Sequence, residues 1–268
     1  MSIRLSEIWI YPIKSLGGIR LQKGKVMDKG LEHDRRYMLV DLQNRFLTQR
    51  VHPNMSQFKL SRHEDCFRVT YNKEHIDIAV QPAQSGKRIE VTIWQDTVSA
   101  LVMEDTVNNW FSERLGMPCK LVFFPEENER TVDREFAKNN EQVSLADGYP
   151  YLVIGKKSLE DLNAKLDRPV PMNRFRPNFV FEGGEPYEED LWKKVNIGAS
   201  QFEGLKLCAR CVLTTVDQET GEKGAEPLAT LSTYRKKGSK VNFGQNLVRI
   251  KGDEVIEGDE IHVLSLQE

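Results

Sequence analysis

The segment IEVTIWQDTVSALV, residues 89–102, alternates apolar and polar side chains on both sides of the polar pair Gln95-Asp96. Alternation with a period of two residues is typical of a β-strand that buries one face. A polar pair at the centre of such a segment is typical of a turn. We therefore predict two strands, residues 89–94 and 97–102, with a turn at Gln95-Asp96 between them.

Short apolar stretches of the same kind recur along the chain. Their length and their content of Val, Ile and aromatic residues favour strands. The polar segment 125–142 has a high charge density and no period, so we expect an exposed loop or lid there and place a domain boundary near its start. The further strands that we expect are residues 8–13, 37–40, 67–71, 76–80, 119–124, 151–154, 179–181, 195–197, 202–207, 247–250 and 260–266.

Three segments predict helices instead. Residues 104–115 place apolar side chains at helical spacing and are followed by Gly116, which is typical of a helix end. Residues 158–166 begin with Ser158, which we expect to cap the helix. Residues 227–234 begin with a proline, which is favourable at a helix start. The sequence therefore predicts a mostly β fold with a few helices, a β-rich α+β class, and a chain of 268 residues favours two packed units.

The composition is that of an ordinary globular protein, with 39% hydrophobic and 29% charged residues. The net charge of -2 gives no overall field for nucleic acid or an anionic membrane, so any anion must be bound by a local cluster. The N-terminus lacks the features of a secretory signal, and no window approaches a membrane span of about 18 uncharged apolar residues, which favours the cytoplasm. Four cysteines are too few for a disulfide scaffold here, so we expect reduced thiols.

Cys211 carries the most chemical information in the sequence. It lies in the run LCARCVLTTVD, residues 207–217, directly after Arg210 and three residues after Cys208. An adjacent cation favours the thiolate, which is both a soft metal ligand and a nucleophile. Three other interpretations are open. The first is a zinc site, although the other cysteines and the histidines are scattered along the sequence. The second is a redox pair, although the residues after Cys211 are strand-like. The third is two ordinary core cysteines.

Three polar clusters could bind an anion. Lys14 and Ser15 end an apolar stretch and are soon followed by two glycines, so an ammonium, a hydroxyl and backbone N–H groups could converge on a phosphate. Arg35 could make a bidentate contact with a phosphate or a carboxylate. Arg176 and Asn178 share one face of an extended segment. Each cluster is also compatible with a plain turn, an exposed strand end or a solvated strand face.

Short motifs follow one another in order along nearly the whole chain. They are YPIKS (11–15), DR (34–35), DLN (161–163), FRPN (175–178), RCVLTTVD (210–217), EPL (226–228) and FGQ (243–245). Together they resemble the family in which a MOSC N-terminal β-barrel domain precedes a MOSC domain, the group of the mitochondrial amidoxime-reducing component and its bacterial relatives. The resemblance implies two β-barrel-like domains, which we place at residues 1–122 and 123–268.

The resemblance also implies a cofactor, molybdenum held by a molybdopterin, with Cys211 as the protein's ligand to the metal. Lys14, Ser15 and Arg35 match positions that hold the phosphate or the pterin of the cofactor. These are the same residues that the first two anion clusters contain.

A second strip of pterin contacts is implied at Arg176 and Asn178. The family has a further contact with the cofactor near residues 147–150, usually through small hydroxyl residues. This chain has Gly148 and Tyr149 there, which leaves that contact open.

By this resemblance the protein reduces an N-hydroxylated small molecule, such as an amidoxime or a hydroxylamine, through oxygen-atom transfer to molybdenum. Thr214 or Asp217 could relay a proton, although either could simply hydrogen-bond the turn after the strand. The sequence has no cluster of four cysteines for an iron–sulfur centre. We therefore expect the electrons to come from a separate donor protein that carries a flavin or an iron–sulfur centre.

Two alternatives remain open. Cys211 could carry a persulfide and pass its sulfur to an acceptor, as in sulfuration of the molybdenum cofactor, which requires only an accessible sulfur. The chain could also bind the cofactor without turnover. Only the two cofactor-binding interpretations need a phosphate and pterin pocket built from both halves of the chain.

Overall fold

The computed structural model describes residues 2–83, 85–133, 135–137 and 139–267. These residues form nineteen β-strands and three α-helices, together with four short 3-10 helices. The predicted β-rich α+β class is therefore confirmed. Within the same residues, no helix is long and apolar enough to cross a membrane.

The largest sheet has nine strands in the order β19-β14-β15-β17-β12-β13-β1-β2, with β16 beside β17. Neighbouring strands are antiparallel except β12 and β13, which run parallel. The strands of this sheet are β1 (Arg4–Ile10), β2 (Ile19–Leu21), β12 (Tyr151–Gly155), β13 (Phe179–Glu182), β14 (Trp192–Ile197), β15 (Ser200–Ala209), β16 (Lys236–Lys237), β17 (Lys240–Lys251) and β19 (Ile261–Leu266).

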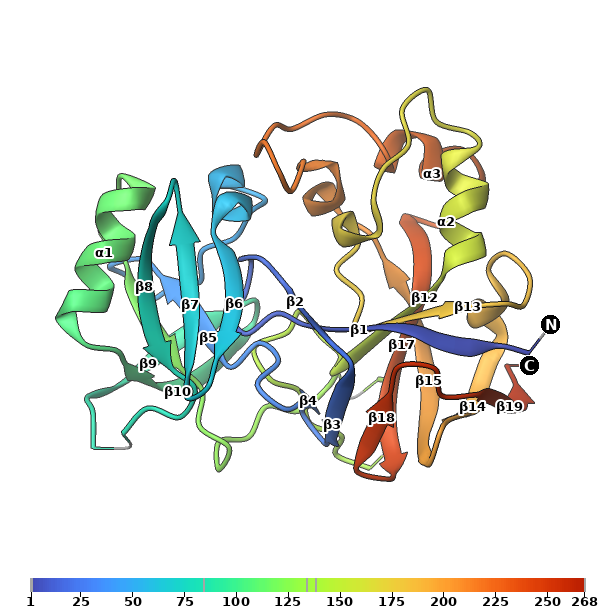
Figure 1. Ribbon diagram of the computed structural model, residues 1–268, viewed down its shortest axis with the longest axis horizontal. Coiled ribbons are helices and arrows are strands. Elements are labelled where there is room, and N and C mark those ends of the chain that lie inside the picture. Colours follow the sequence, from blue (N-terminus) through green and yellow to red (C-terminus); the bar gives the residue numbers. More distant parts are fainter. Residues whose placement is uncertain (1, 84, 134, 138, 268) are drawn as a thin grey trace.

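Three smaller sheets complete the fold, in the orders β5-β11-β10-β9, β6-β7-β8 and β18-β3-β4. Their strands are β3 (Lys23–Met27), β4 (Gly30–Leu31), β5 (Tyr37–Val40), β6 (Lys59–His63), β7 (Cys66–Tyr71), β8 (Glu74–Ala79), β9 (Arg88–Ile93), β10 (Asp96–Val102), β11 (Lys120–Phe123) and β18 (Glu254–Ile256). Figure 1 shows β5 to β10 gathered in one lobe, and the later strands of the nine-stranded sheet in the other.

The hairpin of β9 and β10 turns one residue earlier than the sequence pattern predicts. Asp96 pairs with Ile93, so the turn consists of Trp94 and Gln95. Trp94 has a left-handed backbone conformation with φ of 56° and its residue is 46% exposed. The shift removes Trp94 from the strand and leaves its indole free to contact other segments.

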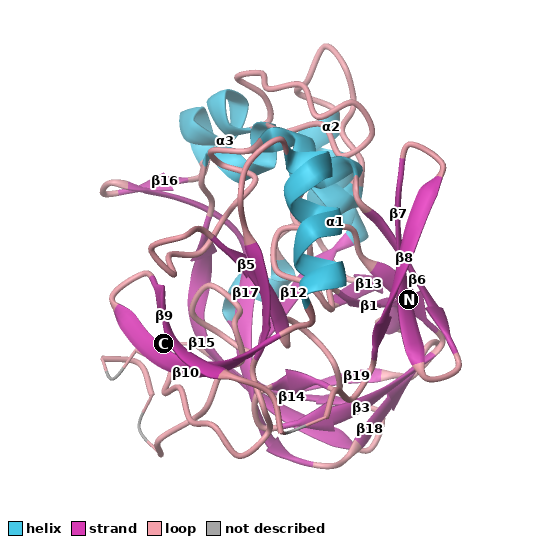
Figure 2. Ribbon diagram, turned by 90° about the vertical axis from the view of Figure 1, so that its left-hand side faces the viewer, coloured by secondary structure: helices cyan, strands magenta, loops and turns pink. Residues whose placement is uncertain are grey.

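The three predicted helices are present with small changes in their ends. Helix α1 (Asp105–Leu115) ends at Gly116, which adopts the expected left-handed conformation. Helix α3 (Leu228–Tyr234) follows Pro227. Helix α2 (Lys156–Asn163) starts before Ser158, so the predicted cap is wrong. The Ser158 hydroxyl instead donates to the buried carboxylate of Glu189 at 2.9 Å. Figure 2 shows α2 and α3 lying together at one end of the molecule.

The two halves of the sequence are joined by pairing and by packing. Strands β1 and β2 belong to the sheet of the later strands, and β3 pairs with β18. One hydrophobic core cluster contains Leu5, Phe58, Phe111, Phe179 and Trp192, which come from both halves. The predicted domain boundary at residue 122 therefore stays a prediction. The nine-stranded sheet and the core cluster both contain residues from either side of it.

The segment 125–142 contains no helix or strand among its described residues; residues 134 and 138 lie outside them. It is not simply an exposed loop. Arg130 and Val132 are only 6% and 1% exposed. The Arg130 guanidinium donates to the backbone carbonyls of Ser144 and Ala146, at 2.8 and 2.6 Å. This buried arginine ties the segment to the chain just before residue 147.

Candidate functional site

A cavity of about 400 Å³ collects side chains from distant parts of the sequence. Nine of the ten residues predicted from the sequence to form the site line it, and Asp217 does not. The nine are Lys14, Ser15, Arg35, Gly148, Tyr149, Arg176, Asn178, Cys211 and Thr214.

The Lys14-Ser15 turn is fixed by backbone pairing and by a buried amide pair. The Lys14 N–H donates to the carbonyl of Tyr37, at the start of β5, at 2.8 Å. The Gln49 side chain donates to the carbonyl of Ser15 at 2.7 Å. Gln49 and Gln218 also donate to each other through their side-chain amides, at 3.2 and 3.0 Å. Since Gln218 follows the Cys211 segment closely, this pair holds the turn beside that segment.

Arg35 and Arg176 lie against the ring of Tyr11, with guanidinium carbons 4.3 and 4.1 Å from its centroid. Both arginines have left-handed backbone conformations, with φ of 50° and 57°. Arg35 donates to the buried carboxylate of Asp34 at 2.6 Å and to the Asn178 side chain at 3.2 Å. The two clusters predicted separately at Arg35 and at Arg176-Asn178 are therefore one cluster in space.

Arg176 is 7% exposed, and only part of its hydrogen-bonding capacity is used. Its Nη1 donates to the carbonyl of Leu16 at 2.7 Å, whereas its buried Nη2 has no partner among the residues that the structure describes. Burial lowers the pKa of Arg176 to about 10. A buried guanidinium with a free donor is a ready partner for an anion or a carbonyl oxygen.

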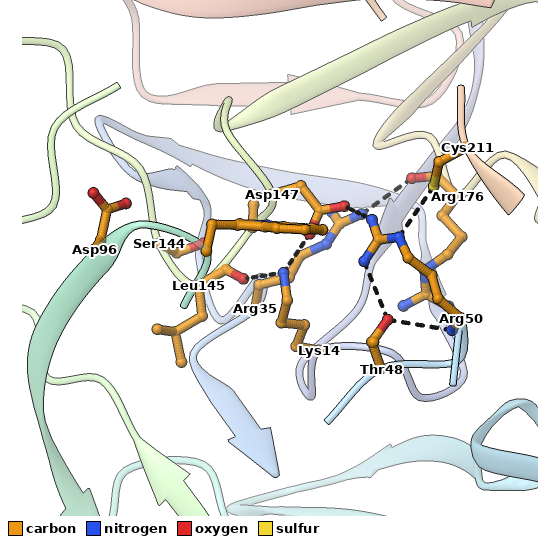
Figure 3. Close-up of polar contacts among 12 residues, drawn as sticks. Lys14, Arg35, Thr48, Arg50, Asp96, Ser144, Leu145, Asp147, Arg176 and Cys211 are labelled. Carbon is orange, nitrogen blue, oxygen red and sulfur yellow. Dashed lines mark hydrogen bonds and ion pairs between the residues drawn. The ribbon is translucent and has the colours of Figure 1, made fainter. Parts of the chain in front are cut away.

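Arg50 lies at the centre of the contacts in this site, although no motif in the sequence indicates it. Its Nε donates to the Cys211 sulfur at 3.1 Å, and its other nitrogens donate to Asp147 at 2.6 Å and to Thr48 at 3.1 Å. Its guanidinium also stacks on Trp94, 4.6 Å from a ring centroid. Figure 3 shows Arg50 between Asp147 and Cys211, so one planar group fixes the sulfur and the carboxylate together.

Asp147 is shared by two cations. Lys14 forms an ion pair with it and donates to the carbonyl of Leu145 at 2.9 Å. Burial lowers the pKa of Lys14 to about 8, although Asp147 opposes this effect. Burial alone would raise the pKa of Asp147, but Lys14 and Arg50 hold it well below its usual range. Because these two cations keep it ionised, the Asp147 side chain, which is 53% exposed, presents a carboxylate rather than a neutral acid to the cavity.

Cys208 lines the same cavity as Cys211. Its sulfur accepts from Nη1 of Arg210 at 2.8 Å, and Nη2 of Arg210 donates to the carbonyl of Phe175. The other two cysteines are not part of the lining. Cys66 begins β7, and Cys119 is buried beside Ser112, whose hydroxyl contacts it.

Thr214 and Asp217 follow Cys211 in and after the 3-10 helix Val212–Thr215. The Thr214 hydroxyl donates to the carbonyl of Cys211 at 3.0 Å. Asp217 accepts from the backbone N–H groups of Glu219 and Thr220 at 2.8 and 3.0 Å, and from Arg174 at 2.7 Å. Asp217 therefore holds the turn after Cys211, and a proton relay through it gains no support from the geometry.

The lining of the cavity is strongly cationic. Its charged residues include one carboxylate, Asp147. Besides Arg176 Nη2, two buried polar atoms of the lining have no partner in the described part of the chain: Tyr149 Oη and Arg210 Nε. A thiol beside an excess of cations and free donors suits a ligand that is anionic, rich in acceptors and attached to a soft metal. The cations are Lys14, Arg35, Arg50, Arg176, Lys206, Arg210 and Lys240.

Known proteins with similar sequences include two kinds. A molybdenum cofactor sulfurase of Oryza sativa subsp. japonica is 30% identical over 96% of this chain and 33% of its own length. The mitochondrial amidoxime-reducing component 1 of Mus musculus is 29% identical over 97% of this chain and 82% of its own length. The mitochondrial amidoxime reducing component 2 of Rattus norvegicus is 32% identical over 86% of this chain and 72% of its own length. The chain thus spans a third of the rice sulfurase but most of each amidoxime-reducing component.

Two domain profiles also match the chain, on either side of the predicted division. The profile of the MOSC N-terminal beta barrel domain matches residues 2–118. The profile of the MOSC domain matches residues 140–262. With both domains matched in order, and with a relative above 30% identity aligned over most of both chains, this protein belongs to the family that combines a MOSC N-terminal β-barrel domain with a MOSC domain.

Proposed function

We propose that this protein is a molybdenum-cofactor-dependent oxidoreductase that reduces N-hydroxylated small molecules, with electrons from a separate protein. The observation that carries the proposal is the convergence of Cys211, Lys14, Arg35 and Arg176 on one cavity although they are far apart in the sequence. A soft sulfur beside a cationic pocket suits a metal that is carried by an anionic organic cofactor. The similarity to the amidoxime-reducing components supports this substrate class.

The residues of the cavity fit such a cofactor. Cys211 would ligate the metal, and the free Nη2 of Arg176 would donate to a phosphate or pterin oxygen. Lys14, Arg35 and Asn178 would supply further donors to the same molecule, and the cations would offset its negative charge. Gly148 leaves room at the wall, because a Cβ atom there would meet nothing within 4 Å.

When bound, the cofactor supplies two-electron oxygen-atom transfer, and the protein supplies position and charge. Arg50 orients the Cys211 sulfur through its N–H contact. Asp147 is ionised at neutral pH, so it can accept an N–H or O–H from a substrate but has no proton to donate. Lys14, with a pKa of about 8, is a group of this cavity that can release a proton near neutral pH.

Sulfur transfer is a second candidate function, favoured by one specific observation. Cys208 and Cys211 line the same cavity, and each sulfur accepts an N–H from an arginine. A persulfide carrier needs an accessible, oriented sulfur of this kind. Similarity to a molybdenum cofactor sulfurase supports this candidate. It does not, however, account for the free donor of Arg176 or for the excess of cations.

The test combines composition with turnover. Purified protein is analysed for molybdenum and pterin and is then assayed for reduction of benzamidoxime with an artificial electron donor. We expect near-stoichiometric metal together with turnover. Metal without turnover would indicate a cofactor-binding protein, and labile sulfane sulfur without metal would indicate the sulfur carrier.

Cys208→Ser is the matched control for Cys211→Ser, because the two cysteines line the same cavity and each contacts an arginine. We expect Cys211→Ser to abolish turnover and loosen the metal while the fold is kept. We expect Cys208→Ser to retain both. Equal losses in the two variants would contradict the reductase and would point to a paired-cysteine chemistry.

A further inference from the structure

Two lysines of the cavity are not explained by the contacts described above. Lys206 lies on β15 and Lys240 is the first residue of β17, and these strands pair with each other. Both side chains line the cavity. Lys14 and Arg50 are compensated by Asp147, and Arg35 is compensated by Asp34. Neither Lys206 nor Lys240 forms a salt bridge within 4.0 Å with another described residue, although the acids Asp133 and Glu135 lie near Lys206.

The two ammonium groups are close enough to affect each other. Burial lowers the pKa of Lys206 and the positive charge of Lys240 lowers it further, whereas the nearby carboxylates of Asp133 and Glu135 raise it in part. The Lys206 Nζ also lies 3.7 Å from the ring centroid of Phe136, which fixes the position of the ammonium through a cation–π contact. Two like charges held near each other repel, and an anion between them removes the repulsion.

The same cavity contains a hydrogen-bond donor with nothing to donate to. Tyr149 Oη is buried and has no partner in the described part of the chain. Burial raises the pKa of Tyr149 strongly, and the nearby acids Asp133 and Glu135 and the thiol of Cys208 add to this effect, so the hydroxyl keeps its proton. A neutral hydroxyl and two ammonium groups can all donate to one oxyanion.

We propose that Lys206 and Lys240 form an anion subsite on the β15–β17 wall of the cavity, which binds a phosphate or carboxylate group of the bound molecule. This subsite is separate from the cluster of Lys14, Arg35 and Arg176, which comes from other segments. The oxyanion has two possible sources, the terminal phosphate of the cofactor or a carboxylate on the substrate. The choice between these sources rests on the proposed function, whereas the existence of the subsite does not.

The first experiment measures anion binding without turnover. Cofactor-free Lys206→Gln/Lys240→Gln protein is titrated with inorganic phosphate, and the rise in melting temperature gives the affinity. The matched control is Lys236→Gln/Lys237→Gln, which removes the same charge from exposed positions on the neighbouring strand β16. We expect the subsite variant to bind phosphate at least about tenfold more weakly than the wild-type protein, because it loses two charge-assisted hydrogen-bond donors. We expect the control to change by less than about twofold, because neither Lys236 nor Lys237 lines the cavity.

The second experiment identifies the source of the anion. Loss of pterin and molybdenum from the subsite variant, with both retained in the control, supports the phosphate of the cofactor. Retained cofactor, with a KM that rises about tenfold for 4-carboxybenzamidoxime but not for benzamidoxime, supports a substrate carboxylate.

Equal phosphate affinity in the two double variants overturns the subsite. If the wild-type protein reduces neither amidoxime, the proposed function fails, and the phosphate titration alone still decides whether the subsite exists.

Discussion

Replacing Arg176 with Met distinguishes the proposed contact of this side chain with the cofactor from its structural contacts. Arg176 is buried, donates to the carbonyl of Leu16 and stacks on Tyr11, and its Nη2 has no partner within the described residues. Met has a similar length, and it carries the same backbone cost in the left-handed conformation because neither residue is glycine. The variant therefore removes mainly the charge and its donors.

The expected change in the free energy of unfolding is the sum of opposing contributions. Burial lowers the pKa of Arg176 to about 10, a shift that corresponds to about 3 kcal/mol of unfavourable free energy for the charged side chain. The charge-assisted hydrogen bond to Leu16 returns about 2 kcal/mol and the cation–π contact about 1 kcal/mol. Without a ligand, these contributions nearly cancel. The free energy of unfolding of cofactor-free Arg176→Met should therefore lie within about 1 kcal/mol of the wild type.

Cofactor binding should respond differently, because Nη2 gains its partner only from a ligand. We expect Arg176→Met to weaken pterin retention by about tenfold to a hundredfold. Urea unfolding of the cofactor-free protein gives the stability, and fluorescence of the oxidised pterin after gel filtration gives the retention. A decrease of more than about 3 kcal/mol in the free energy of unfolding would show that the main role of Arg176 is structural. A pterin content equal to that of the wild type would show that Arg176 does not contribute to cofactor binding.

Three other variants test separate parts of the structure. Burial raises the pKa of Glu189 to about 7, above its value in the unfolded chain. The free energy of unfolding of the wild-type protein should therefore fall as the pH rises from about 4.5 to about 7. Urea unfolding of Glu189→Gln should show little of this pH dependence. Gly148→Ser should change the melting temperature by no more than about 1 °C and should keep or raise pterin content, because its Cβ enters open space; a large destabilisation would contradict the open wall. Arg50→Lys cannot contact Cys211, Asp147 and Thr48 together, so molybdenum content should fall while the melting temperature stays close to that of the wild type.

The strands and helices could be predicted because their signals are local. Alternating residues located β9 and β10, and helical spacing with Gly116 located α1. The exact turn between β9 and β10 could not be predicted, since a shift of one residue leaves the alternation almost unchanged. That shift decides where Trp94 lies, so the stacking of Arg50 on Trp94 could not be predicted either.

The site was predictable only in part. Cys211, Lys14, Arg35 and Arg176 lie within motifs that resemble a known family, and all of them line the cavity. Arg50 lies in the loop between β5 and β6 and reaches Cys211 across 161 residues of sequence, with no motif around it.

The remaining contacts of the site have the same limitation. Lys206 and Lys240 are ordinary lysines in the sequence, and only the pairing of β15 with β17 brings them to one wall. Long-range contacts of this kind depend on the assembled sheet, which no local pattern encodes.

The proposed ligation of molybdenum by Cys211 is tested most directly by X-ray absorption at the molybdenum edge. In wild-type protein and in Cys208→Ser, we predict a thiolate sulfur bound to the metal in addition to the sulfurs of the cofactor. In Cys211→Ser we predict that this sulfur is missing, or that the metal is no longer retained. A metal environment in Cys211→Ser that is identical to that of the wild type would contradict the assignment of Cys211 as the ligand.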